Sequence, residues 1–335
     1  MPEVMGGKPL DLAEILTAMQ ADLRRVEERL RQEVDVEYPF VGEILQGLIE
    51  AGGKRLRPLV LLLSAKPFDY DLQRLLPAAA GVELLHTASL IHDDTVDRAG
   101  LRRGRPTLNS LFDQGTVILL GDYVFARSAM LAAETMNPRV VGVFASSLAD
   151  ICDGQLSEIF SAHQIDQTLE QYERRIYGKT ASLFAGSAEM GAILAGASDD
   201  QIAALTRYGK NIGMAFQIVD DVLDLRETTD EIGKPASLDL RQGTVTLPTM
   251  LFFQQNGHDE CKADLVRRAV NGDETTDEIY ATATTVIRES GALDHAVEIA
   301  EGYVAEAKAA LEIIPQCEAW EMLDALADAC LHRTR

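Results

Sequence analysis

The chain has 335 residues, of which 47% are hydrophobic and 25% are charged, an ordinary balance for a folded protein with a large core. Its formal net charge of -22 at pH 7 disfavours binding to nucleic acid and to anionic lipid. The four cysteines form no CxxC pair, which argues against a zinc site and favours reduced thiols in a cytoplasmic protein. We find no signal-peptide pattern and no apolar run of the ~18–20 residues that a membrane span needs, so we expect no transmembrane segment.

Apolar residues recur at helical spacing along most of the chain, and alternating strand patterns are scarce. In chain order, this pattern predicts helices over 10–33, from Pro58, from Pro77 into Asp93, over 115–136, 140–162 and 169–194, and from Asp199 into a second acidic segment. Pro77 suits the first turn of its helix, and Asp199 and Asp200 suit a helix cap. The turn at Gly233-Lys234-Pro235 ends the pattern, and shorter helices follow. No linker rich in Pro, Gly or Ser divides the chain, so we predict one all-helical domain over residues 1–335.

Two aspartate clusters share one layout, Asp93-Asp94-Thr95-Val96-Asp97 and Asp220-Asp221-Val222-Leu223-Asp224. On a helix, residues four apart share a face, so the outer aspartates of each cluster project together and repel each other unless a cation lies between them. Carboxylates without nearby Cys or His ligands suit a hard ion such as Mg²⁺, with phosphate oxygens completing its shell. The ordinary alternative is a solvated acidic face, but the apolar neighbours of both clusters argue against it. Two such clusters that face each other would hold a diphosphate between them through several metal ions.

Basic residues gather at turns near these clusters. They occur in Gly52-Gly53-Lys54-Arg55-Leu56-Arg57-Pro58, in Arg102-Arg103-Gly104-Arg105 and in two Gly-Lys pairs that end at Lys179 and Lys234. Each alone is explained equally well by surface solubility. Together with two metal-type clusters, they indicate phosphate binding. The chain lacks GxxxxGK[ST], which excludes a P-loop.

Six motifs follow one another along the chain: GGKRLRP, LLHTASLIHDDTVD, LRRGRPT, GDYVFARS, YGKTASLF and FQIVDDVLD. In this order they resemble the trans-isoprenyl diphosphate synthases, the polyprenyl synthetase family. The resemblance implies an antiparallel helix bundle around a deep central cavity, in a homodimer. It implies head-to-tail condensation of isopentenyl diphosphate with geranyl, farnesyl or geranylgeranyl diphosphate, with three Mg²⁺ ions per active site.

The resemblance also implies roles for single residues. Asp93, Asp97 and Asp220 would bind Mg²⁺, Asp94 and Asp221 would support them, and Asp224 would act directly or through water. Isopentenyl diphosphate would be held by Lys54, Arg57, His86 and Arg103, and the allylic diphosphate by Arg102, Lys179 and Lys234. Thr180 and Gln217 would line the reaction centre.

Ala88 and Ser89 bear on the product, and Thr244 and the C-terminal tail bear on substrate binding. In family members that make short products, bulky aromatic residues at the positions of Ala88 and Ser89 block the growing tail. Both residues are small here, which predicts a medium- or long-chain product. Thr244 departs from the family pattern, which has a lysine there, so one contact to the allylic diphosphate is weakened or supplied elsewhere. The basic C-terminal tail with Arg333 and Arg335 resembles one that closes over the site, although charge is common at chain ends.

Three alternatives stay open at this point. A class I terpene cyclase shares the metal chemistry but has no need of the isopentenyl-binding set. A non-catalytic subunit of a heteromeric synthase would typically lose the aspartates, which are intact here. An acidic helical scaffold would bind no diphosphate at all.

Overall fold

The computed structural model describes residues 10–34, 38–50, 53–102, 105–226, 237–272 and 276–332. Within these ranges the chain is helical apart from turns and one antiparallel pair of short strands, β1 (Leu101–Arg102) and β2 (Arg105–Pro106). The predicted all-α class is therefore confirmed. The chain contacts define two compact units, unit 1 (1–148, 183–209 and 313–326) and unit 2 (149–182, 210–312 and 327–335). The single domain and the central cavity stay predictions.

Unit 1 is built mainly from the N-terminal helices. They are α1 (Leu12–Ala18), α2 (Gln20–Glu33), α3 (Pro39–Glu50), α4 (Leu56–Ala65), α5 (Leu72–Val96), the 3₁₀ turn η1 (Leu108–Ser110) and α6 (Gln114–Glu134). Most of the C-terminal helix α17 (Glu318–Ala329) also belongs to this unit. Parts of α7 (Pro138–Ser161), α9 (Ser182–Leu194) and α10 (Asp199–Arg226) complete it. The helix expected over 10–33 is interrupted at Met19, which ends α1 and precedes α2.

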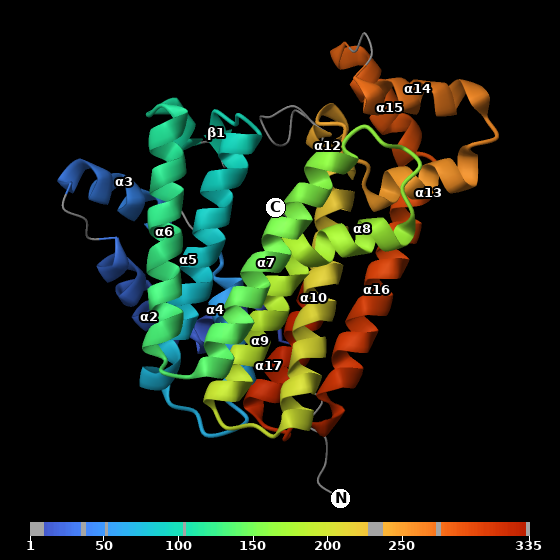
Figure 1. The fold of residues 1–335 in the computed structure, drawn as a ribbon. Coiled ribbons are helices and arrows are strands. Elements are labelled where there is room, and N and C mark those ends of the chain that lie inside the picture. The colour runs from blue at the N-terminus through green and yellow to red at the C-terminus, as the bar shows by residue number, and fades with distance from the viewer. Residues whose placement is uncertain are drawn as a thin grey trace, which may run out of the picture. The chain divides into compact units, whose positions relative to one another are not determined.

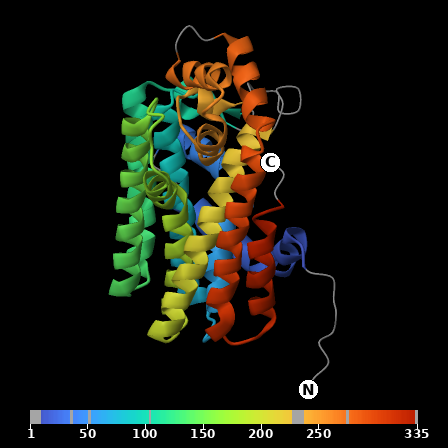
Figure 2. The same cartoon turned by 90° about the vertical axis from the view of Figure 1, so that its right-hand side faces the viewer.

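Helices α5 and α6 pack side by side along their lengths (Figures 1 and 2). They run antiparallel, because Gly81 of α5 lies opposite Leu131 of α6 whereas His92 lies over Gly121. A Cβ atom added at Gly121 would come within 2.3 Å of the His92 ring, so a larger residue there would require that ring to move. This contact fixes the end of α5 that carries the first aspartate cluster.

Two predicted helix starts were wrong. The helix expected to begin at Pro77 begins at Leu72, because the Asp71 carboxylate accepts a hydrogen bond from Gln73 N and caps it. Pro77 therefore lies in the second turn. Asp199 and Asp200 are the first residues of α10, and the cap is Ser198, whose hydroxyl and backbone exchange hydrogen bonds with Gln201.

Unit 2 holds most of the C-terminal half. Its elements are α8 (Leu169–Ile176), the π-helix η2 (Tyr177–Ala181), α12 (Leu238–Arg241), α13 (Leu247–Asn256), α14 (Glu260–Asn271), α15 (Asp277–Arg288), α16 (Ala292–Ala310) and the beginning of η3 (Leu311–Ile313). Helix α14 packs on α15, and α13 packs on α16 (Figure 1). The helix predicted over 169–194 thus contains a π-helical turn, which the apolar spacing did not indicate.

Helix α6 is long and apolar enough, by length and composition, to cross a membrane. Buried helices of soluble proteins pass the same test, and one face of α6 packs on α5. Among the described residues no other helix passes it. The expectation that the chain lacks a transmembrane segment stays a prediction.

Candidate active site

The first aspartate cluster lies at the C-terminal end of α5, in unit 1. Asp97 ends the helix, and its backbone N–H donates to Asp93 O at 2.8 Å. Because the C-terminal end of a helix carries partial negative charge, carboxylates there are unfavourable without a cation. Asp93 is half-buried and Asp97 exposed, so both can reach a ligand from solvent. Their position favours the predicted cation site.

Asp94 differs from Asp93 and Asp97 in being buried. Its Oδ1 accepts a hydrogen bond from Arg102 Nε at 2.7 Å, and its backbone oxygen accepts one from Asn109 Nδ2 at 2.8 Å. Arg102 pairs with Arg105 across the strand pair β1–β2. Asp94 therefore holds the hairpin that carries Arg102, a predicted ligand of the allylic diphosphate.

The basic loop before α4 contains one buried cation, Arg55, and one exposed cation, Lys54. Arg55 adopts a left-handed conformation (φ 53°) and is buried, where it forms an ion pair with Glu83 at 2.8 Å. Its neighbour Lys54 is exposed, and Arg57 lies in the first turn of α4 with its guanidinium 4.8 Å from the centre of the Phe184 ring. The buried Arg55–Glu83 pair thus anchors the loop that presents Lys54 and Arg57.

The predicted tail-contacting residues also lie on α5. Ala88 is fully buried, and Ser89 is half-buried with its hydroxyl donating to His86 O at 2.8 Å. The Ser89 hydroxyl therefore lies against its own helix. Beyond the Cβ atom, Ala88 has no side-chain atoms and Ser89 has only this hydroxyl. His86 is half-buried and lies on α5 seven residues, about two helical turns, before Asp93.

The second cluster lies near the C-terminal end of α10, in unit 2. Asp220 is half-buried, whereas Asp221 and Asp224 are buried. The Asp224 carboxylate accepts hydrogen bonds from the backbone N–H groups of Leu238 and Asp239, at 3.3 and 3.2 Å, and so caps α12. Asp224 therefore joins the metal-type cluster to the segment that contains Thr244.

A chain of hydrogen bonds links the second cluster to the predicted reaction-centre residues. The Tyr172 hydroxyl donates to Asp221 Oδ2 at 2.8 Å, and Gln217 Nε2 donates to Asp221 Oδ1 at 2.8 Å. Thr180 Oγ1 then donates to Gln217 Oε1 at 2.6 Å. Burial raises the pKa of the Asp221 carboxyl, and the hydrogen bonds from Gln217 and Tyr172 act against that shift. Tyr172 was not singled out from the sequence, since a buried hydroxyl has no pattern that distinguishes it from a core tyrosine.

Lys179 and Thr180 lie on the π-helix η2, a rare conformation that often marks functional sites. Helix α7 passes very close to it at Gly154. A Cβ atom added to Gly154 would lie 2.4 Å from Lys179 N and 2.8 Å from Gly178 C. The glycine therefore allows the close approach that positions these two predicted catalytic residues.

Acidic residues surround Lys179 and the end of α10. The Lys179 ammonium forms a partly buried ion pair with Glu158 of α7. The pKa of Asp239 is raised by burial and then by the nearby carboxylates of Asp224 and Asp221. So many carboxylates in one place again favour a bound cation. Glu158 and Asp239 were missed as site candidates, because neither lies within an aspartate motif.

The predicted residues that the structure describes divide between the two units. In unit 1 these are Lys54, Arg57, His86, Ala88, Ser89, Asp93, Asp94, Asp97 and Arg102, and in unit 2 they are Lys179, Thr180, Gln217, Asp220, Asp221 and Asp224. The predictions for Arg103, Lys234, Arg333 and Arg335 fall outside the described residues. Thr244 is half-buried, and its backbone N–H donates to Asp239 O at 2.8 Å.

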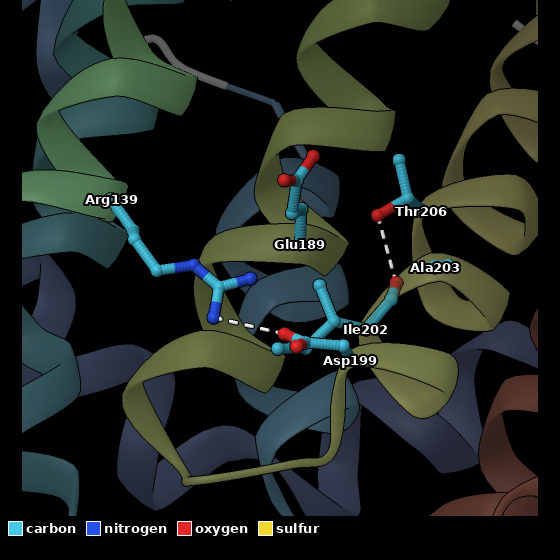
Figure 3. A pocket seen from close by; sticks show the side chains of 6 residues that line it. All are labelled: Arg139, Glu189, Asp199, Ile202, Ala203 and Thr206. Atoms are coloured by element: carbon cyan, nitrogen blue, oxygen red, sulfur yellow. Dashed lines mark hydrogen bonds and ion pairs between the residues drawn. The ribbon is translucent and has the colours of Figure 1, made fainter.

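A separate open pocket of about 600 Å³ lies in unit 1, where α7, α9 and α10 meet (Figure 3). Its lining includes Glu189 and an exposed ion pair of 3.0 Å between Arg139 and Asp199. No residue predicted to bind substrate or metal lines it. The pocket therefore adds nothing to the candidate active site.

Comparison with known proteins identifies relatives of this chain. The sequence profile described as Polyprenyl synthetase matches residues 38–284. A protein named heptaprenyl diphosphate synthase component 2, from Geobacillus stearothermophilus, is 39% identical over 318 residues, 95% of this chain and 98% of the relative. The octaprenyl diphosphate synthase of Haemophilus influenzae is 33% identical over 321 residues, 95% of this chain and 96% of the relative.

A solved structure has the same fold. The polyprenyl synthase of Caulobacter crescentus, described as complexed with calcium and isoprenyl diphosphate, superposes with a TM-score of 0.91 at 34% identity, covering 98% of this chain and 99% of that one. The all-helical fold is thus that of the isoprenoid synthases. Since the profile covers well over half of the chain, the chain belongs to the polyprenyl synthetase family.

Proposed function

We propose that this protein condenses isopentenyl diphosphate head to tail with an allylic diphosphate, giving a medium- or long-chain all-trans polyprenyl diphosphate. The observation that carries the proposal is the placement of an aspartate cluster at the C-terminal end of each of two long helices, α5 and α10. Each cluster has diphosphate-type cations within its own unit, Arg102 beside Asp94 in one and Lys179 on η2 in the other. The heptaprenyl and octaprenyl names of the relatives agree with this activity.

Mg²⁺ is the cation that best fits the donor atoms. The candidate ligands are carboxylate oxygens, and the described residues contain no set of three or more His, Cys, Asp or Glu side chains that could hold a metal alone. Mg²⁺ commonly uses one or two carboxylates and completes its shell with phosphate and water. We assign Asp93, Asp97 and Asp220 as ligands for three ions. Asp94 and Asp221 support them, and Asp224 acts directly or through water.

The remaining cations divide between the two substrates. Lys54, Arg57, His86 and Arg103 would hold isopentenyl diphosphate, and Arg102, Lys179 and Lys234 would hold the allylic diphosphate. Of the first set, Lys54 and Arg57 lie at the start of α4 and His86 lies on α5, and the buried Arg55–Glu83 pair supports the loop before α4. The allylic set includes Lys179, which forms an ion pair with Glu158. When the diphosphate binds, a phosphate oxygen would replace part of this contact with Glu158.

The chemistry follows from this charge arrangement. When bound, Mg²⁺ would neutralise the charge that develops on the leaving diphosphate. Lys179 and Arg102 would stabilise the same charge as the allylic C–O bond ionises. The double bond of isopentenyl diphosphate then attacks the allylic carbon, and the departing diphosphate takes the proton that is lost. Thr180 and Gln217 would lie beside the reacting carbon, and no protein nucleophile is needed.

A long product is supported by the small residues on α5 below the aspartates. Ala88 and Ser89 lie about one helical turn, ~5 Å, before Asp93. With Ala88 buried and the Ser89 hydroxyl bonded to its own helix, nothing bulky from these positions stops the growing tail. We propose that the product exceeds the fifteen-carbon farnesyl length.

We also propose a homodimer in the cytoplasm, formed through α6. The face of α6 away from α5 exposes Leu119, Met130 and Ile118, whose exposed fractions are 69, 58 and 40%. Three alanines, Ala126, Ala129 and Ala133, extend this exposed apolar face. Exposed large apolar side chains gathered on one helix favour a protein interface.

One experiment tests the activity itself. The purified protein is incubated with labelled isopentenyl diphosphate and geranyl, farnesyl or geranylgeranyl diphosphate, with and without Mg²⁺. We expect label in longer allylic products only when both substrates and the metal are present. Turnover of an allylic diphosphate without isopentenyl diphosphate would instead indicate a cyclase.

A second candidate is that this chain acts as one component of a two-component synthase. The specific observation is that the relative from G. stearothermophilus is named component 2. Both aspartate clusters are intact here, which supports a catalytic role for the chain in either case. An inactive purified chain that regains turnover when a second protein from its own source is added would favour this candidate.

A further inference from the structure

Asp221 is turned away from solvent, and both of its carboxylate oxygens have donors within the protein. Tyr172 donates to Oδ2 and Gln217 to Oδ1, each at 2.8 Å, and only 4% of Asp221 is exposed. Its neighbour Asp220 is half-buried. The two adjacent aspartates of this cluster therefore have different surroundings, and Asp220 is the better placed to meet a cation.

The hydrogen-bond directions along this chain are fixed by chemistry. An ionised carboxylate only accepts, so with Asp221 ionised Gln217 presents its Nε2 to Asp221 and its Oε1 to Thr180. A carbonyl oxygen also only accepts, so the Thr180 hydroxyl must donate its single proton to Gln217 at 2.6 Å. The lone pairs of the Thr180 oxygen are then left for the reaction centre. Tyr172 is the last donor of this chain of hydrogen bonds, and it holds the Asp221 carboxylate through Oδ2.

Tyr172 is itself firmly placed. It is fully buried in α8, and the guanidinium of Arg175 lies 5.6 Å from the centre of its ring. Arg175 is also buried and donates to Val245 O at 2.6 Å, to Gln167 Oε1 at 2.8 Å and to Ser161 Oγ at 3.2 Å. Arg175 is thus held by three hydrogen bonds against the Tyr172 ring, and the ring has little freedom to move.

We propose that Tyr172 is a positioning residue, which acts through Asp221 to orient Gln217 and Thr180, and that Asp221 serves this network in place of binding a metal ion directly. The inference rests on the proposed prenyl transfer, since Thr180 and Gln217 are assigned to its reaction centre. The supporting role of Asp221 would then be to hold Gln217, and through it Thr180. The parallel in unit 1 is Asp94, which is buried and holds Arg102.

Tyr172→Phe tests the proposal, with Tyr208→Phe as its matched control. Tyr208 is also fully buried and donates one hydrogen bond, to Leu323 O at 2.7 Å, but it lies in unit 1 outside the network. Both variants should lower the melting temperature to a similar extent. We expect Tyr172→Phe to lower kcat about tenfold, the effect of losing one buried orienting hydrogen bond, with the KM for isopentenyl diphosphate changed by less than about twofold. Tyr208→Phe should leave kcat within about twofold of the wild type.

A binding measurement separates positioning from metal ligation. The melting temperature is followed against Mg²⁺ concentration in the presence of inorganic diphosphate. Tyr172→Phe and Asp221→Asn should keep the Mg²⁺ midpoint within about threefold, while Asp220→Asn should raise it about tenfold or more. If Tyr172→Phe does not fold, Asp221→Asn alone decides the matter.

Two results would overturn the inference. One is a kcat for Tyr172→Phe no lower than that of Tyr208→Phe, and the other is a Mg²⁺ midpoint for Asp221→Asn raised as much as for Asp220→Asn. A wild-type protein that transfers no prenyl group would contradict the proposed function instead. The three outcomes are therefore distinguishable.

Discussion

At the scale of single residues, the second aspartate of each cluster differs from the first. Asp94 and Asp221 are buried and bonded to neighbouring side chains, whereas Asp93 and Asp220 are half-buried. The sequence predicted both clusters from the spacing of their carboxylates. It could not predict that the second aspartate is buried and hydrogen-bonded. One partner of Asp221, Gln217, lies one turn earlier on α10, but the other, Tyr172, lies on α8 and reaches Asp221 only in the folded protein.

Ser89→Phe should shorten the product. The ring would replace a hydroxyl that lies against its own helix, and it would occupy the space that the growing tail is proposed to use. Product chromatography with farnesyl and isopentenyl diphosphates measures the chain length. Leu90→Phe is the control, since Leu90 is half-buried on the next position around the helix and should leave the length unchanged. An unchanged product length with Ser89→Phe would mean that the tail runs elsewhere.

At the scale of elements, the apolar spacing predicted where most helices lie but not their local irregularities. The π-helix η2 interrupts the helix predicted over 169–194, and it carries Lys179 and Thr180. The 3.6-residue period continues on both sides of a π-turn, so apolar spacing over a long segment does not locate the turn. Helix starts were similarly missed where a side-chain cap decided them, as Asp71 does for α5 and Ser198 for α10.

Gly154→Ala should damage the site through η2. The added Cβ would fall 2.4 Å from Lys179 N, so the π-helix or α7 must shift. We expect a loss of stability on the order of 1–3 kcal/mol, as for an overpacked core, and a lower kcat. Thermal unfolding and steady-state kinetics measure the two effects.

Gly142→Ala is the matched control on the same helix. A Cβ atom there meets nothing within 4 Å, so this change should be neutral or stabilise the protein by up to ~1 kcal/mol through helix propensity. Equal behaviour of the two alanine variants would show that the close approach at Gly154 has no role in positioning Lys179 and Thr180.

At the scale of the whole molecule, the net charge of -22 requires local cations and metal ions to bring anionic diphosphates to the protein. Arg102, which is bonded to Asp94, meets that requirement locally at the first cluster. Composition and helical period were sufficient to predict the all-helical class. They do not determine how the two units are placed, because that depends on contacts between residues far apart in the chain.

Leu119→Glu should weaken the proposed homodimer. Leu119 has 69% of its surface exposed on the apolar face of α6, and a buried carboxylate at an interface is costly. Light scattering coupled to gel filtration should show a smaller mass for the variant at micromolar concentration. Ile313→Glu, at an exposed apolar residue outside α6, is the control and should keep the wild-type mass. A wild-type protein that is already monomeric would contradict the assembly.

The most direct measurement is the product formed by the purified protein from farnesyl diphosphate, excess isopentenyl diphosphate and Mg²⁺. The aspartate clusters, the substrate cations and the small residues Ala88 and Ser89 together predict all-trans products longer than fifteen carbons, and no product after the metal is chelated. No elongation of farnesyl diphosphate, whether the protein is alone or accompanied by a partner, would contradict the account.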